Sequence, residues 1–181
     1  DQCVKLALAD MTIRTSLLDA RLMFGDAGLH ADLMQRFARD VTAGTAKDFI
    51  AAKMAERDQR HTRAGSSRYK VEPNIKDGKG GLRDLHTLHW LAKYLYGAGP
   101  GTGALPPDIF THAEHATFRQ CEDFLWTVRC HLHFMTGRPE ERLSFDLQPT
   151  IGRLMGYAER GGPQARARRA VERFMKHYFL V

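Results

Sequence analysis

The sequence predicts a mainly α-helical bundle, and three observations favour that fold class. Apolar side chains recur at helical spacing in several long segments, as at Leu29, Leu33, Phe37 and Val41. Residues that favour helix starts, and glycines that favour helix ends, bracket most of these segments. The chain has 181 residues and is 43% hydrophobic, so it carries enough apolar material to bury a core.

Most of the helices can be placed by their apolar stripes and capping residues. They are expected at 1–10, from Gly25-Asp26 to about Gly44, from Thr45 to about Arg63, at 81–96, from Asp108 to Thr136, within 143–157 and at 170–181. Pro149 fits the first turn of its helix, where its missing N–H costs little. The Gly/Pro run 97–107 and the basic stretch 160–169 are expected to be loops.

Segment 11–24 has a periodicity that leaves two structures open. Its apolar residues fit one face of a helix. However, Leu18, Ala20 and Leu22 also alternate with charged neighbours such as Asp19, as they would along a strand. The spacing alone does not decide between helix and strand.

The composition is typical of a soluble protein from a reducing compartment. Its three cysteines are odd in number, and Cys121 and Cys130 lie about 13 Å apart on one expected helix, too far to form a disulfide. We therefore expect a cytoplasmic protein. No apolar run approaches the roughly 20 residues that span a bilayer. The formal net charge of +6 favours an acidic partner, which could be a nucleic acid, a nucleotide or an acidic protein surface.

The most informative stretch is the glycine-rich loop 71–85, which leads directly into an expected helix. Pro73 restricts the residue before it to extended conformations, and Gly78, Gly80 and Gly81 permit backbone angles and close approaches that other residues do not. The loop is therefore expected to have a defined shape. It is not a Walker A loop, because the spacing from Gly to Gly-Lys-Ser/Thr is absent, and it is not a dinucleotide-binding fingerprint.

The charges of this loop suit a phosphate. Lys76, Lys79 and Arg83 stand beside the start of the helix, where unpaired N–H groups and the positive end of the helix dipole favour an anion. The alternative is that the glycines only turn the chain and that the cations are solvated.

The loop also resembles a known family signature. The stretch Glu72-Pro73-Asn74-Ile75-Lys76-Asp77-Gly78-Lys79-Gly80-Gly81-Leu82-Arg83-Asp84, followed by Trp90, is similar to that of the PII uridylyltransferase/uridylyl-removing enzyme family, the bifunctional nitrogen sensor of bacteria. Four further matches occur in the same order, at 17–22 before Gly25-Asp26, at 124–133, at 137–148 and at 171–179. A looser version of the loop occurs in glutamine synthetase adenylyltransferase.

The resemblance implies a domain organisation and an activity. Residues 1–24 would form the C-terminal end of a nucleotidyltransferase core and would contribute its last helix and strand, which favours the strand for 11–24. Residues 25–181 would form the helical uridylyltransferase-associated bundle that follows. The intact enzyme would transfer UMP from UTP to a tyrosine of the PII signalling protein and would remove it by hydrolysis in a separate domain. UTP, the PII protein and other domains of the same polypeptide are the implied partners, whereas nucleic acid and membrane are not.

Asp19 is the candidate catalytic residue and metal ligand. Nucleotidyl transfer uses Mg²⁺, with Mn²⁺ also possible, held by several carboxylates. Similar nucleotidyltransferases present an Asp-x-Asp pair and a third carboxylate on a later strand, and Asp19 matches that third position. The alternative is a structural role, as a cap or in a salt bridge to Arg21. Neither Asp-x-Asp nor the His-Asp pair of the hydrolytic domain occurs in the sequence, so the chain alone is expected to be inactive.

The loop and the resemblance together give a candidate site. The residues expected to bind the UTP phosphates are Lys76, Lys79, Gly80, Gly81 and Arg83, and those expected to support them are Glu72, Asn74, Asp84, Arg129 and His133. Asp84, in the first turn of the helix, would orient Arg83 or a loop N–H. Arg129 and His133 form either a hydrogen-bonded core pair or a surface that faces the nucleotide. The rival hypothesis is a helical interaction module that docks the PII protein or neighbouring domains without touching nucleotide.

Overall fold

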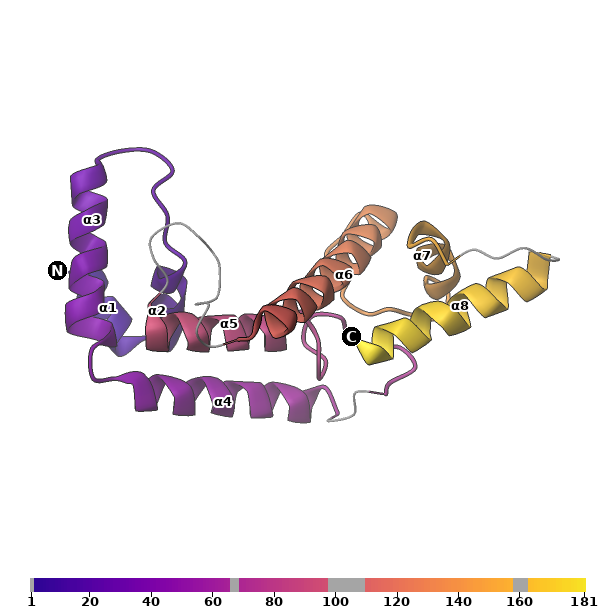
Figure 1. The fold of residues 1–181 in the computed structure, drawn as a ribbon, viewed down its shortest axis with the longest axis horizontal. Helices are drawn as coiled ribbons and strands as arrows, with labels where there is room; N and C mark the ends of the chain where they lie inside the picture. The colour runs from indigo at the N-terminus through magenta and orange to yellow at the C-terminus, as the bar shows by residue number, and fades with distance from the viewer. Residues whose placement is uncertain (1, 66–68, 98–109, 158–162) are drawn as a thin grey trace. The chain divides into compact units, whose positions relative to one another are not determined.

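The structure is a computed structural model that describes residues 2–65, 69–97, 110–157 and 163–181. Those residues are mainly helical and contain no strand, which confirms the predicted fold class (Figure 1). The helices are α1 (Gln2–Ala9), α2 (Met11–Leu18), α3 (Ala27–Arg36), the π-helical turn η1 (Phe37–Thr42), α4 (Ala46–Arg63), α5 (Leu82–Tyr96), α6 (His112–Thr136), α7 (Gln148–Leu154) and α8 (Pro163–Leu180). None of these described helices has both the length and the apolar character that crossing a membrane requires.

The chain divides into two compact units. The first unit combines Asp1–Arg57 with Thr87–His115, and the second combines Asp58–His86 with Ala116–Val181. Helices α4, α5 and α6 therefore each contribute residues to both units. The expected domain boundary at residue 24 refers to a longer polypeptide and stays a prediction.

The core of the first unit is built around stacked aromatic rings. The rings of Phe49 in α4 and Tyr94 in α5 are nearly parallel, and their centroids are 3.8 Å apart. The Tyr94 hydroxyl donates to the Val41 carbonyl oxygen at 3.2 Å, so this buried phenol is satisfied. The remaining buried members of this core are Ala7, Leu18, Phe37 and Val41. This packing fixes the second half of α5 within the first unit.

Segment 11–24 is where the strand prediction is wrong. Residues Met11–Leu18 form helix α2, and its first turn is capped by the Asp10 carboxylate, which accepts from the N–H groups of Thr12 and Ile13. The Arg14 guanidinium donates to the carbonyl oxygens of Ala7 and Leu8 and so satisfies the end of α1. These local bonds stabilise the helical conformation of Met11–Leu18, whereas a strand would need a neighbouring strand as its hydrogen-bond partner.

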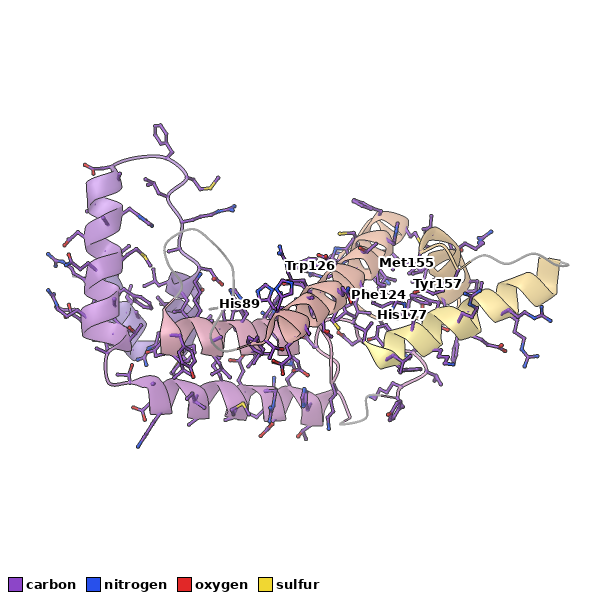
Figure 2. All side chains as sticks on the ribbon, viewed as in Figure 1. His89, Phe124, Trp126, Met155, Tyr157 and His177 are labelled. Atoms are coloured by element: carbon purple, nitrogen blue, oxygen red, sulfur yellow. The ribbon has the colours of Figure 1, made fainter. Side chains whose placement is uncertain are left out.

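The core of the second unit lies among α6, α7 and α8. Its fully or largely buried members are Ile75, Val128, Leu132, Leu143, Ile151, Phe174 and Met175. In Figure 2 the labelled side chains of Phe124, Met155, Tyr157 and His177 gather where these three helices meet. The ring centroids of Phe124 and His177 are 4.6 Å apart. Because Ile75 belongs to this core, the glycine-rich loop is anchored in the second unit.

Several predicted boundaries agree with the structure and two need correction. Helices α4 and α5 match their expected ranges closely. Helix α6 begins at His112, after a capping box in which Thr111 and Glu114 bond each other's N–H groups, whereas the expected cap Asp108 lies outside the described residues. The loop expected at 160–169 is wrong from Pro163 onward, where α8 begins. Proline favours the first helical position, and the alanines and arginines that follow are good helix formers.

Candidate functional site

The glycine-rich loop takes its shape from Asn74. The side-chain oxygen of Asn74 accepts hydrogen bonds from the N–H groups of Lys76 (3.0 Å) and Asp77 (2.6 Å). Its carbonyl oxygen accepts from the N–H of Gly78 at 3.0 Å. Asparagine is well suited to such a turn because its short amide mimics a backbone carbonyl. The predicted supporting role of Asn74 therefore has a local geometric basis.

Two features of the loop require glycine. Gly80 has a φ of +81°, a left-handed conformation that costs other residues about 1–2 kcal/mol. A Cβ atom on Gly81 would lie 2.7 Å from the Ile75 carbonyl oxygen, and one on Gly78 would lie 2.4 Å from that of Asn74. These contacts are with backbone atoms, so relief would need a shift of the loop itself.

The first backbone N–H groups of α5 already have partners within the loop. Leu82 donates to the Ile75 carbonyl (3.0 Å), Arg83 donates to the Lys76 carbonyl (2.9 Å), and Asp84 donates to the Gly81 carbonyl (2.9 Å). A helix start usually offers these donors to a capping group or an anion. An anion bound at this loop would therefore be held mainly by the cationic side chains and not by the backbone N–H groups.

The loop is fastened to the segment that follows α6. Ile75 donates its N–H to the Glu141 carbonyl oxygen, and Leu143 donates to that of Pro73, each at 2.9 Å. The Glu72 carboxylate accepts from the Phe145 N–H at 2.9 Å and from Arg142, and these two contacts lower the pKa of Glu72. The predicted supporting residue Glu72 thus joins two segments about 70 positions apart in the sequence.

Asp84 joins the loop to the end of α4. Its carboxylate accepts from the Gly80 N–H at 2.8 Å, from Arg60 and from His61. The side chains of Asp84, Arg60 and His61 are all largely buried. Of the two arrangements considered for Asp84, the structure therefore contains the bond to a loop N–H. The sequence gives no direct sign that Asp84 pairs with Arg60, 24 positions away.

Two of the candidate phosphate-binding cations, Lys76 and Arg83, form long ion pairs. The Lys76 ammonium lies 4.0 Å from the Glu141 carboxylate, and Arg83 Nε lies 3.9 Å from that of Asp77. The Lys76 and Arg83 side chains are about a third exposed, and Lys79 is exposed. An ion pair at such a distance contributes little to stability, so the Lys76 ammonium can turn toward a ligand at low cost.

Glu141 is a residue of this site that the sequence did not single out. Its carboxylate accepts three hydrogen bonds from Arg129, the shortest at 2.7 Å. It lies 3.6 Å from His133 Nε2 and 4.0 Å from the Lys76 ammonium. It therefore brings the loop together with Arg129 and His133. The sequence signal was limited to Arg129 and His133 on one helix, which favours an acidic partner but does not say which one.

Asp19 lies in the first unit and is the C-terminal cap of α2. Its carboxylate accepts from Trp90 Nε1 and from the Lys93 ammonium, both at 2.8 Å, and His89 lies 3.8 Å away. His89, Lys93 and Trp90 hold the pKa of Asp19 far below its ordinary value. The expected salt-bridge partner was Arg21, whereas the structure supplies Lys93.

The described residues do not make up a metal site. No group of three or more His, Cys, Asp or Glu residues among them is placed to share a metal ion. The two Asp19 oxygens are already bonded to Trp90 and Lys93. A magnesium ion in a nucleotidyltransferase needs several carboxylate oxygens, and the described residues do not by themselves supply that set. The remaining candidate residues belong to the second unit.

These observations define a helical domain in which a charged glycine loop is fixed to a buried core. The chain belongs to the family described as GlnD PII-uridylyltransferase, which it matches over residues 48–181. It is similar over its whole length to the bifunctional uridylyltransferase/uridylyl-removing enzymes of Rhodopseudomonas palustris (56% identical) and Rhodospirillum rubrum (50% identical), and over 180 residues to that of Phenylobacterium zucineum (57% identical). The chain spans 19% of the length of each of these relatives. No solved structure matches it.

Proposed function

We propose that this chain is the helical part of an enzyme that transfers UMP from UTP to a tyrosine of the PII signalling protein. Membership of the GlnD family supports the reaction class, because the similar proteins are named for transferring and removing uridylyl groups. The chain's own contribution would be to complete the cleft for the nucleotide and the protein substrate.

The glycine loop is the observation that carries this proposal. It is held rigid by Asn74 and Asp84, and the Lys76 and Arg83 side chains beside it are partly exposed. A fixed backbone with adjustable cations suits a triphosphate, whose negative charge must be balanced without a large change in the protein. Lys76 and Arg83 would bind phosphate oxygens, and the exposed Lys79 would add a weaker attraction.

Catalysis would require parts beyond this chain. Because the described residues do not fit a Mg²⁺ or Mn²⁺ ion, we assign the chain no step in metal chemistry. We expect the purified chain to show neither uridylyl transfer nor uridylyl hydrolysis with either ion. Reproducible labelling of PII protein by the chain alone, from UTP labelled in its α-phosphate, would contradict this expectation.

Titration of the chain with UTP tests the proposal. Calorimetry at low and high salt should show binding that weakens as salt increases, because phosphate contacts with partly exposed cations are screened. Lys76→Ala should lower the affinity, while Lys47→Ala, which changes an equal charge outside the loop, should not. Binding that is insensitive to both salt and Lys76→Ala would overturn the phosphate site.

A second function is supported by a different observation. The first N–H groups of α5 are bonded within the loop, and the segment 22–29 exposes several large apolar side chains, namely Leu22, Met23, Phe24 and Leu29. These features suit a helical module that docks PII protein or neighbouring domains without nucleotide. The same titration separates the two functions, because a docking module should not bind UTP.

A further inference from the structure

Trp126 is a large aromatic side chain that lies partly at the surface of the second unit. It projects from α6, is 38% exposed, and is not a member of the buried core (Figure 2). An indole in this position keeps apolar area in contact with water unless a ligand covers it.

The indole is held by a cation that is itself fixed. The guanidinium carbon of Arg129 lies 4.9 Å from the Trp126 ring centroid, within the range of a cation–π interaction. Arg129 also donates to both oxygens of Glu141, and its side chain is mostly buried. Because a doubly bonded arginine is restrained, the ring beside it is restrained too.

The indole is linked to the glycine loop through neighbouring side chains of the second unit. The ring of His86 lies 6.1 Å from that of Trp126, and Arg83 stands three positions earlier on α5, which places these two side chains on the same face of the helix. On the other side, Lys76 and Arg129 approach the same oxygen of Glu141. One chain of contacts therefore runs from Lys76 through Glu141 and Arg129 to Trp126, and the His86 ring beside Trp126 shares a helix face with Arg83.

We propose that Trp126 stacks against the pyrimidine base of a nucleotide whose phosphates are bound by the loop. This inference rests on the proposed function and adds the base-binding residue to it. A partly exposed aromatic ring beside cations is the arrangement that proteins use to bind a base by its face while balancing its phosphates. Arg129 and His86 act as positioning residues, because they hold the indole and need not touch the ligand.

The test compares UTP with inorganic tripolyphosphate, which carries the charge without the base. Both are titrated into wild-type chain, Trp126→Ala, Trp126→Phe and the control Phe134→Ala, which removes an 82% exposed ring from the same helix. Trp126→Ala should weaken UTP binding about 5- to 100-fold, the range expected for losing one stacked base. It should leave the tripolyphosphate affinity within about twofold. Trp126→Phe should retain most UTP affinity, and Phe134→Ala should match the wild type.

Fluorescence gives a second readout. UTP should change the indole emission of the wild-type chain, and most of that change should be absent in Trp126→Phe, which keeps Trp90 as its single tryptophan. Tripolyphosphate should have little effect on the emission of either protein. Circular dichroism of the variants checks that they are folded.

The outcomes separate this inference from the proposed function. If UTP and tripolyphosphate bind equally well to the wild type and to Trp126→Ala, the loop binds phosphate but the stacking surface is wrong. If neither compound binds the wild type, both proposals are wrong. If Trp126→Ala and Trp126→Phe weaken tripolyphosphate and UTP equally, Trp126 only supports the loop.

Discussion

The indole N–H of Trp90 donates to the carboxylate of Asp19 at 2.8 Å, across 71 positions of sequence. Lys93, one turn further along α5, donates to the other oxygen of the same carboxylate. This arrangement fastens the end of α2 to α5 within the first unit. It gives Asp19 a structural role that can be measured separately from any role in catalysis.

Asp19→Asn should lower the stability of the chain by about 1 kcal/mol. Hydrogen bonds to a charged group contribute about 1.5–3 kcal/mol, and the partial exposure of Asp19 reduces that figure. Denaturant unfolding of the wild type and the variant measures the difference. In a full-length relative, a loss of turnover with unchanged stability would instead favour the metal-ligand hypothesis.

Acid should remove this contribution of Asp19. Its pKa is lower in the folded chain than in the unfolded chain, so its stabilising effect is fully present above about pH 4 and declines as the pH falls below that value. The stability difference between the wild type and Asp19→Asn should therefore shrink with acidification. A difference that stays constant from pH 6 to about pH 3 would contradict the assignment.

Lys76→Ala and Arg83→Ala should each weaken UTP binding about tenfold or more. Losing a charge-assisted phosphate contact costs about 1.5–3 kcal/mol, whereas the long ion pairs of these residues contribute little to stability. Lys79→Ala should have a smaller effect, because Lys79 is exposed. Thermal unfolding provides the control. If Lys76→Ala and Arg83→Ala unfold at a lower temperature than the wild type but bind UTP normally, the loop has a role in helix packing and not in phosphate binding.

Asp84→Ala should destabilise the second unit by about 2 kcal/mol. The substitution removes the carboxylate that accepts from Arg60, His61 and the Gly80 N–H, and losing hydrogen bonds to a largely buried charged group is costly. Asp77→Ala is the matched control, because its carboxylate is more exposed and its ion pair is long. Equal midpoints of denaturant unfolding for the two variants would contradict a stabilising role for the Asp84 hydrogen bonds.

Gly81→Ala should be more damaging than Gly80→Ala. A methyl group at Gly81 would clash with backbone carbonyl oxygens, which suggests a cost of about 2 kcal/mol or more. Gly80 has open space around it, so alanine there meets only the unfavourable φ, at about 1–2 kcal/mol. Urea unfolding of both variants measures the order, and the reverse order would show that the loop can relax around Gly81.

The sequence predicted the helices well because their signals are local. Apolar stripes and caps such as Asp26, which accepts from two N–H groups of α3, lie within a few residues of the structure that they produce. The strand prediction for segment 11–24 was wrong. The periodicity of the segment fitted both helix and strand, and the family resemblance favoured the strand. The bond of Asp10 to the first turn of α2 was the local signal that outweighed it.

The candidate site was predictable in its loop and not in its partners. Asn74 and the glycines act over four or five positions, so their spacing already indicates a shaped turn. Glu141 and Arg60 act on residues far away in the sequence, and charge alone does not say which acid pairs with which base. Whether Lys76, Lys79 and Arg83 bind nucleotide stays a prediction.

The most direct test of the central claim is a nuclear magnetic resonance titration of the chain with UTP. The account predicts that the amide signals of 76–84 and the side-chain signals of Arg83 and Trp126 shift in a saturable, salt-sensitive manner, while those of segment 22–29 stay in place. Saturation with UTP that leaves the loop signals unchanged would contradict the account and would return the loop to a purely structural role.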